Sequence, residues 1–250
     1  MDAENVIATR ELTKRYNGQA AVDGLTFSVR AGEVYGFLGP NGAGKTTTLL
    51  MLLGLTEPTG GQVRVMGIDP AREPIKVKRQ IGYLQENMGF YRDLSGWQSL
   101  NYIAELNGIY GADARARIEA ALVQTGLENE AHKKVGAYSR GMRQRLGFAE
   151  ILLKNPRIAF LDEPTLGLDP DATNRMLEMI QDLCRRQKMT VLLSSHLLHQ
   201  VQRICHRVGI MIGGHLVAEG PMQKLAAEKL GVGQEQYTLE EIYMKYFKES

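Results

Sequence analysis

Nine consecutive residues between two apolar runs form the strongest chemical pattern in the chain. They are Gly39, Pro40, Asn41, Gly42, Ala43, Gly44, Lys45, Thr46 and Thr47. The run at 34–38 before them predicts a strand, and the run at 48–53 after them predicts a helix. Glycines allow a backbone curl whose N–H groups, with the helix N-terminus, point at an anion. The pattern therefore predicts a phosphate-binding loop, in which Lys45 contacts phosphate oxygens and Thr46 binds Mg²⁺.

Two adjacent carboxylates follow a second apolar run. Residues 157–161 predict a buried parallel strand, and Asp162 and Glu163 come at its end. Asp162 is expected to hold Mg²⁺ through its water shell. Side chains alternate along a strand, so Glu163 should point the other way and activate a water that attacks the γ-phosphate. Such pairs are often only solvated turns, but the phosphate-binding loop favours the catalytic interpretation.

A third motif, AYSRGMRQRL at residues 137–146, lies between these two. With it the chain resembles the ATP-binding subunits of ABC transporters, most of all those of ABC-2 type and multidrug exporters. The resemblance covers residues 5 to about 220, with every motif in the family's order. It implies that Ser139 and Gly141 contact the γ-phosphate held by an opposite subunit.

Arg140 departs from the commonest family pattern, which has glycine there. An alternative for this stretch is a basic helix face that binds nucleic acid. Helical spacing puts only Arg140 and Arg143 on one side, away from Arg145. No nucleic-acid partner is therefore expected.

The resemblance assigns three further residues. His196, directly after the β-rich run 190–195, corresponds to a switch histidine at the γ-phosphate. Asp169, in Gly167-Leu168-Asp169, corresponds to a loop that couples the two sites of a dimer, and Tyr16 to an aromatic ring stacked on adenine. Tyr16 could instead be a packed aromatic at a strand end. A metal cluster of His196 with His199 and His206 is disfavoured, because the spacing matches no usual ligand set.

Gln85 and Glu86 leave one assignment open. They follow the expected strand 81–84, where the family has a glutamine that senses Mg²⁺ and the transmembrane partner. Either side chain offers an oxygen ligand. Counting from Gly82 favours Glu86, but a gap elsewhere would restore Gln85.

The composition suits a chain that forms its own hydrophobic core and relies on a separate protein to cross the membrane. The 250 residues are 44% hydrophobic and carry a net charge of +2, which suggests no polyanionic partner. Cys184 and Cys205 have no ligand spacing and are expected to be reduced and buried. No signal peptide or membrane span is expected, since the longest apolar stretch, 49–55, is about half of the ~18 residues required. The predicted location is the cytoplasmic face of the cell membrane, through a permease.

The expected fold is α/β: a P-loop NTPase core, mostly a parallel sheet with flanking helices, plus an antiparallel β lobe and a helical lobe. The ATPase domain is predicted to span 1–230 and the C-terminal amphipathic tail helix 231–250. The antiparallel lobe is expected from strands near 6–13, 26–29 and 62–66, with turns at Asn17-Gly18 and Gly60-Gly61. The helical lobe is expected at about 89–154, with Ser95 as a cap and with Tyr102, Leu106 and Ile109 on one helix face. In the tail, helical spacing between Tyr237 and Phe247 predicts an amphipathic helix. This helix resembles the tail helices of ABC-2 type ATPases, and the alternative is that its apolar face packs on its own domain.

The resulting prediction is an ATP- and Mg²⁺-dependent ATPase subunit that drives a separate transmembrane permease. It should act with a second copy or paralogue, because the chain has one copy of each half-site motif. Two alternatives are a soluble ABC ATPase acting on the ribosome or DNA, and a GTPase or small-molecule kinase. The first usually brings two cassettes or coiled-coil inserts, and the second leaves Ser139, Asp169 and His196 unexplained.

Overall fold

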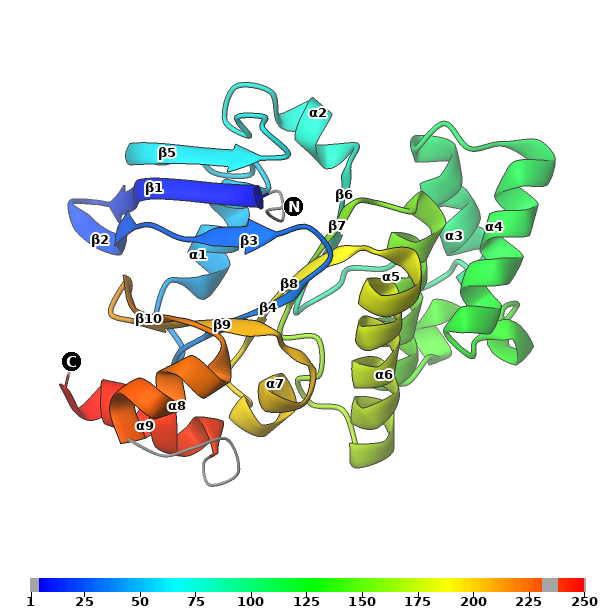
Figure 1. The fold of residues 1–250 in the computed structure, drawn as a ribbon. Coiled ribbons are helices and arrows are strands. Elements are labelled where there is room, and N and C mark those ends of the chain that lie inside the picture. Colours follow the sequence, from blue (N-terminus) through cyan, green and yellow to red (C-terminus); the bar gives the residue numbers. More distant parts are fainter. Residues whose placement is uncertain (1–4, 231–237, 250) are drawn as a thin grey trace.

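A computed structural model describes residues 5–230 and 238–249, and a six-stranded sheet runs through its centre (Figure 1). The strand order is β10-β9-β4-β8-β7-β6, parallel except for the antiparallel pair β10 and β9. The strands are β4 (Val34–Leu38), β6 (Ile81–Leu84), β7 (Ile158–Asp162), β8 (Thr190–Ser195), β9 (Arg207–Ile212) and β10 (His215–Gly220). Because strands β4, β7 and β8 are parallel neighbours, their carboxyl ends meet at one edge.

Both faces of this sheet are covered, which explains the nearly continuous apolar strands. On one face pack α6 (Pro170–Gln187), α7 (Leu198–Ile204), α8 (Met222–Leu230) and α9 (Leu239–Glu249). On the other lie α1 (Lys45–Leu52) and the antiparallel sheet, with α2 (Pro74–Lys78) beyond them. Along β4, Tyr35 and Phe37 face the second layer, while Val34 and Leu38 face the first. Both cysteines are free and buried, as expected.

The predicted antiparallel lobe is present, with one strand more than the sequence indicated. It contains β1 (Asn5–Tyr16), β2 (Gln19–Leu25), β3 (Ser28–Arg30) and β5 (Gly60–Val65), and β1 pairs with the other three. Asn17 and Gly18 form the predicted hairpin turn, both with positive φ. Strand β2 was not predicted, because its sequence QAAVDGL lacks clean alternation. Two boundaries were wrong: the strand expected at 26–29 begins at Ser28, and Gly60-Gly61 opens β5.

The helical lobe forms within the predicted 89–154 segment (Figure 1). It comprises α3 (Gly96–Leu106), α4 (Gly111–Gln124), the short 3₁₀ turns η1 (Glu128–Glu130) and η2 (Val135–Ala137), and α5 (Arg140–Lys154). Ser95 caps α3, and Gln98 completes a capping box with it.

The apolar face expected on α3 is not its buried face. Tyr102 and Leu106 are exposed, and Ile109 lies beyond the helix end. Helix α3 instead buries Leu100 and Ala104 against α4 and α5. Spacing alone could not distinguish the two faces, because both carry apolar residues.

The C-terminal helix α9 packs on its own chain. Leu239, Ile242 and Tyr246 are buried in the core that α7 and α8 share with the sheet. Residues 231–237 of the predicted tail lie outside the described residues. Within the described part of the chain, none of the helices is both long and apolar enough to cross a membrane.

Candidate functional site

The glycine-rich loop links β4 to α1 at the carboxyl edge of the sheet. Gly44, the N-cap of α1, has φ +99°, and a Cβ there would lie 2.5 Å from the carbonyl oxygen of Ala21. Only glycine fits this conformation and this approach. The Lys45 ammonium lies at the loop, donating to the carbonyl oxygens of Gly39 (2.7 Å) and Pro40 (3.1 Å). Burial lowers the pKa of Lys45, although the charge of Glu163 opposes this shift.

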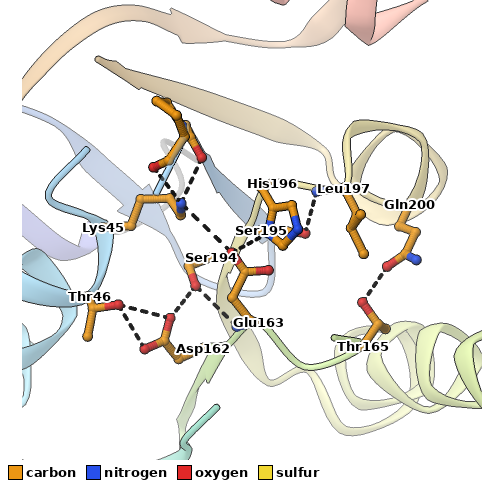
Figure 2. Close-up of polar contacts among 12 residues, drawn as sticks. Lys45, Thr46, Asp162, Glu163, Thr165, Ser194, Ser195, His196, Leu197 and Gln200 are labelled. Atoms are coloured by element: carbon orange, nitrogen blue, oxygen red, sulfur yellow. Dashed lines mark hydrogen bonds and ion pairs between the residues drawn. The ribbon is translucent and has the colours of Figure 1, made fainter. Parts of the chain in front are cut away.

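Asp162 and Thr46 lie side by side, as the metal-binding prediction requires (Figure 2). The Thr46 hydroxyl is 3.1 and 3.4 Å from the two Asp162 carboxylate oxygens. A residue that the sequence analysis missed, Ser194, donates a hydrogen bond to the same carboxylate. Ser194 is paired with Asp162 across the parallel strands β7 and β8. The available signal was a serine at the carboxyl end of a buried strand.

Glu163 reaches the site by a route that strand alternation did not predict. It lies one residue beyond β7 with φ +48°, the left-handed region that non-glycine residues rarely adopt. Its N–H is held 3.2 Å from both the carbonyl oxygen and the hydroxyl of Ser194. The side chain is 8% exposed. Backbone turning at Glu163, rather than the two-residue repeat, therefore sets the direction of this carboxylate.

The two oxygens of Glu163 have different surroundings (Figure 2). Oε1 lies 3.0 Å from Nδ1 of His196 and 3.8 Å from Nζ of Lys45. Oε2 is buried and has no hydrogen-bond partner among the described residues. The structure thus brings together the predicted residues Lys45, at the start of α1, and Glu163 and His196, which directly follow β7 and β8.

Further hydrogen bonds hold the segments that follow β7 and β8. Ser195 accepts a hydrogen bond from the N–H of Leu197, and Thr165 donates to Gln200 of α7 (Figure 2). Sequence analysis missed Thr165 and Gln200, whose contact bridges 35 residues of chain. His206 has a different contact from His196: its Nδ1 accepts a hydrogen bond from the N–H of Val34 at 2.9 Å.

Ser139, Gly141 and Asp169 form a second group away from the phosphate-binding loop. Ser139 caps α5 by accepting from Met142 N–H, and Asp169 caps α6 by accepting from Ala172 N–H. Gly141 faces Ala172, so the two helix starts adjoin. Within the described residues, no hydrogen bond or ion pair joins this group to Lys45 or Glu163.

The arginines after Ser139 mostly serve the fold. Arg140 lies over Gly167, which leaves no room there for a Cβ. Arg143 donates to the carbonyl oxygen of Tyr138, and Arg145 donates to carbonyl oxygens after α4. Arg143 and Arg145 thus hold backbone carbonyl groups within the helical lobe.

Gln85 and Glu86 face different surroundings. The negative charge of Glu86 is close enough to Lys45 to oppose the fall of the lysine pKa. Gln85 lines a cavity between the end of β6 and the helical lobe. Glu86 also lines a separate cavity with Arg140 and Arg143 of the helical lobe.

Tyr16 lies at the exposed end of β1. Its side chain is 47% exposed, and the Lys14 ammonium lies 5.0 Å from the ring centroid. A side chain exposed to this extent is not a packed strand-end aromatic.

Comparison with known proteins identifies the family. Residues 22–166 match the family model described as ABC transporter. The chain is 42% identical over 220 residues to the bacitracin transport ATP-binding protein BcrA of Bacillus licheniformis, covering 88% of this chain and 71% of that protein. It is 39% identical over 222 residues to the Nod factor export ATP-binding protein I of Burkholderia thailandensis, covering 89% and 73%.

A solved structure gives the same answer. The fold matches one described as an ATP binding subunit of an ABC transporter with a TM-score of 0.86 and 29% identity, over 97% of this chain and 99% of the other. The predicted P-loop core with antiparallel and helical lobes is therefore confirmed. The chain belongs to the ABC transporter family, as an ATP-binding and ATP-hydrolysing subunit.

Proposed function

We propose that this chain powers an ABC-2 type exporter, coupling ATP hydrolysis to transport by a separate transmembrane permease at the cytoplasmic face of the membrane. The observation that carries the proposal is the cluster of Lys45, Glu163 and His196 at one sheet edge, in a chain whose relatives are a bacitracin transport protein and a Nod factor export protein.

In the proposed reaction, Glu163 is the general base. Its Oε1 is engaged by His196 and lies near Lys45, whereas Oε2 has no partner in the described chain. Oε2 is therefore the oxygen that accepts a proton from water. The water oxygen then attacks the γ-phosphorus as the bond to the ADP oxygen breaks, and Lys45 stabilises the negative charge on the phosphate oxygens.

His196 has a positioning role in this scheme. Its Nδ1 lies 3.0 Å from Glu163 Oε1 and fixes the carboxylate against rotation. The His196 side chain is 35% exposed. In the proposed site its ring also contacts the γ-phosphate, as the family resemblance implies.

The oxygen donors beside the loop fit Mg²⁺. Thr46 and Asp162 offer a hydroxyl and a buried carboxylate about 3 Å apart, which matches the oxygen-only preference of this ion. Glu86, or Gln85, would add an oxygen or hold a bound water. When bound, Mg²⁺ would neutralise phosphate charge, and Ser194 would hold the Asp162 carboxylate in place.

The second group of residues is proposed to act on the ATP of a second copy or paralogue. Ser139 and Asp169 are exposed, and within the described part of the chain their side chains bond only at the N-termini of their own helices. The N-terminus of α5, with Ser139 and Gly141, is suited to bind an incoming phosphate. Asp169 would couple the two sites of the dimer.

Two measurements test this function. Chain carrying Glu163→Gln should double its mass on addition of ATP, in solution light scattering, and a strictly monomeric ATP-loaded chain would exclude the shared site. The tagged wild-type chain, recovered from detergent-solubilised membranes of its own cells, should bring with it a multi-span membrane protein whose vesicles show ATP-dependent export. Recovery only of ribosomes or nucleic acid would overturn the transporter assignment.

A further inference from the structure

A cavity of about 150 Å³ opens between the end of β6, the loop that follows it, α3 and α5. A cavity of similar size can hold a group as large as benzene, so this one can accept the end of a large side chain. It is lined by Tyr83, Gln85, Met88, Gly89, Phe90, Tyr91, Ser99, Tyr102, Ile103 and Glu150. One wall is thus Gln85, the neighbour of Glu86 in the chain.

Glu150 is the one lining side chain, among the described residues, with a formal charge at neutral pH. No hydrogen bond or ion pair within the described chain involves its carboxylate. Lys154, one turn further along α5, donates instead to the carbonyl oxygens of Lys78 and Ile81. Glu150 is partly buried. A partly desolvated carboxylate without a partner is stabilised by an approaching cation, so the cavity favours an occupant that brings a positive charge.

The rim of the cavity is aromatic. Tyr91 and Tyr102 are 62% and 41% exposed, and their ring centroids are 5.7 Å apart in an edge-to-face pair. Phe90 is half-buried and packs against the core of the helical lobe. Exposed tyrosines are common anchors of protein interfaces, and their ring faces attract lysine and arginine. Ser99 adds a buried hydroxyl that has no partner in the described structure.

We propose that this cavity receives a lysine or arginine side chain from a cytoplasmic segment of the permease, which forms an ion pair with Glu150. The inference rests on the proposed function, since it names the chemistry by which that partner is recognised. An apolar occupant would desolvate Glu150 without pairing it, and would therefore bind less well.

The ion pair would make assembly depend on pH. Burial raises the pKa of Glu150 to about 7, and the positive charge of Lys154 opposes this rise. The other ionisable groups that line the cavity are the phenols of Tyr83, Tyr91 and Tyr102. Burial raises the pKa of Tyr83 to about 12. A cation in the cavity favours ionised Glu150, so affinity should increase as pH rises from 6 to 8.

The test uses the full chain and the permease that the wild-type chain recovers from membranes. Binding of the two purified proteins in detergent is measured with wild type, Glu150→Gln, Glu150→Lys and a matched control, Glu119→Gln, at an exposed position on α4. Glu150→Gln should weaken binding about tenfold or more and abolish its pH dependence. Glu150→Lys should weaken it further, and one Lys or Arg to Glu change in a cytoplasmic loop of the permease should restore binding to that variant only.

The outcomes separate this inference from the proposed function. Failure of wild type to recover any membrane protein contradicts the proposed function. Recovery by wild type together with binding of Glu150→Gln within twofold, or with an unchanged pH profile, overturns the ion pair alone. Thermal melting checks that each variant is folded, and if Glu150→Lys does not fold, Glu150→Gln decides by itself.

Discussion

Glu163, which is buried, and Glu150, which is partly buried, are two carboxylates in different electrostatic surroundings. Glu163 lies between Lys45 and His196 at the edge of the parallel sheet. Glu150 lies on α5, where, among the residues that the structure describes, the positive charge acting on it is that of Lys154. Burial dominates at Glu150 and raises its pKa to about 7.

At Glu163 the chain itself supplies the positive charges that compensate the carboxylate, whereas at Glu150 a partner would supply them. The Glu163 site draws its charges from three segments that a rigid sheet holds in register. Among the described residues, the lining of the Glu150 cavity has polar groups and aromatic rings but no cation. A carboxylate of the first kind suits chemistry on a bound substrate, and one of the second kind suits recognition of a charged protein segment.

The largest expected effect is loss of turnover on removing the charge of Glu163. Glu163→Gln keeps the shape of the side chain but cannot accept the water's proton. ATP hydrolysis by the isolated chain should fall about 10²-fold or more, with ATP binding retained, because loss of a general base has effects of this size. Steady-state phosphate release and nucleotide binding are the measurements. Glu119→Gln is the control, and turnover of Glu163→Gln within threefold of wild type would remove Glu163 from its proposed role.

The next effect concerns Glu150 and the pH dependence of stability. Its pKa is raised from the ordinary 4.5 to about 7, so between these values the folded state holds a proton that the unfolded state has released. Stability of the wild type should therefore fall as pH rises from about 4.5 to 7 and then level off. Glu150→Gln removes this term. The variant should gain about 2 kcal/mol of unfolding free energy over wild type between pH 5 and pH 8, allowing for partial solvation.

Urea unfolding followed by Trp97 fluorescence measures this difference. Trp97 is the only tryptophan in the sequence and lies in α3, which forms one wall of the cavity. Glu119→Gln should show no such pH-dependent gain, because that side chain is exposed. A gap between Glu150→Gln and wild type that stays constant across the pH range would mean that Glu150 titrates normally.

The Glu163 site could largely be predicted from sequence, whereas the Glu150 cavity could not. Lys45, Thr46 and Asp162 follow local rules, since each lies at the end of a strand or start of a helix whose position the apolar runs define. The left-handed conformation of Glu163 was missed because strand periodicity stops at Asp162. Ser194 was missed because its contact depends on the register between β7 and β8.

Tertiary packing accounts for the remaining differences. Nothing in the spacing of α5 distinguishes Glu150 from an exposed glutamate, because its burial depends on α3 and the loop after β6. The same dependence hid which face of α3 is buried. The parallel core, antiparallel lobe and helical lobe were predicted because long apolar periodicities and turn residues specify them locally.

A smaller effect should come from the cap of α3, which positions one wall of the cavity. Ser95→Ala removes the oxygen that accepts from Gln98 N–H at 3.1 Å. Loss of such a cap costs about 1 kcal/mol of unfolding free energy. ATP turnover of Ser95→Ala should equal that of wild type. Ser139→Ala removes a cap of the same kind from α5, and it should lower ATP turnover. Equal turnover in the two variants would contradict the proposed role of Ser139.

The smallest effect is expected at the aromatic rim. Tyr91 and Tyr102 form an edge-to-face pair on the surface, and water solvates much of both rings. Such pairs contribute about 0.5 kcal/mol beyond the area they bury when exposed. A double-mutant cycle of Tyr91→Ser and Tyr102→Ser in urea unfolding should therefore give an interaction energy near that value.

Because the rim is available for a partner, the same single variants should weaken permease binding by a larger factor than they weaken folding. If the interaction energy exceeds about 1.5 kcal/mol and permease binding is unaffected, the tyrosines hold the helical lobe together and the rim is not a docking surface.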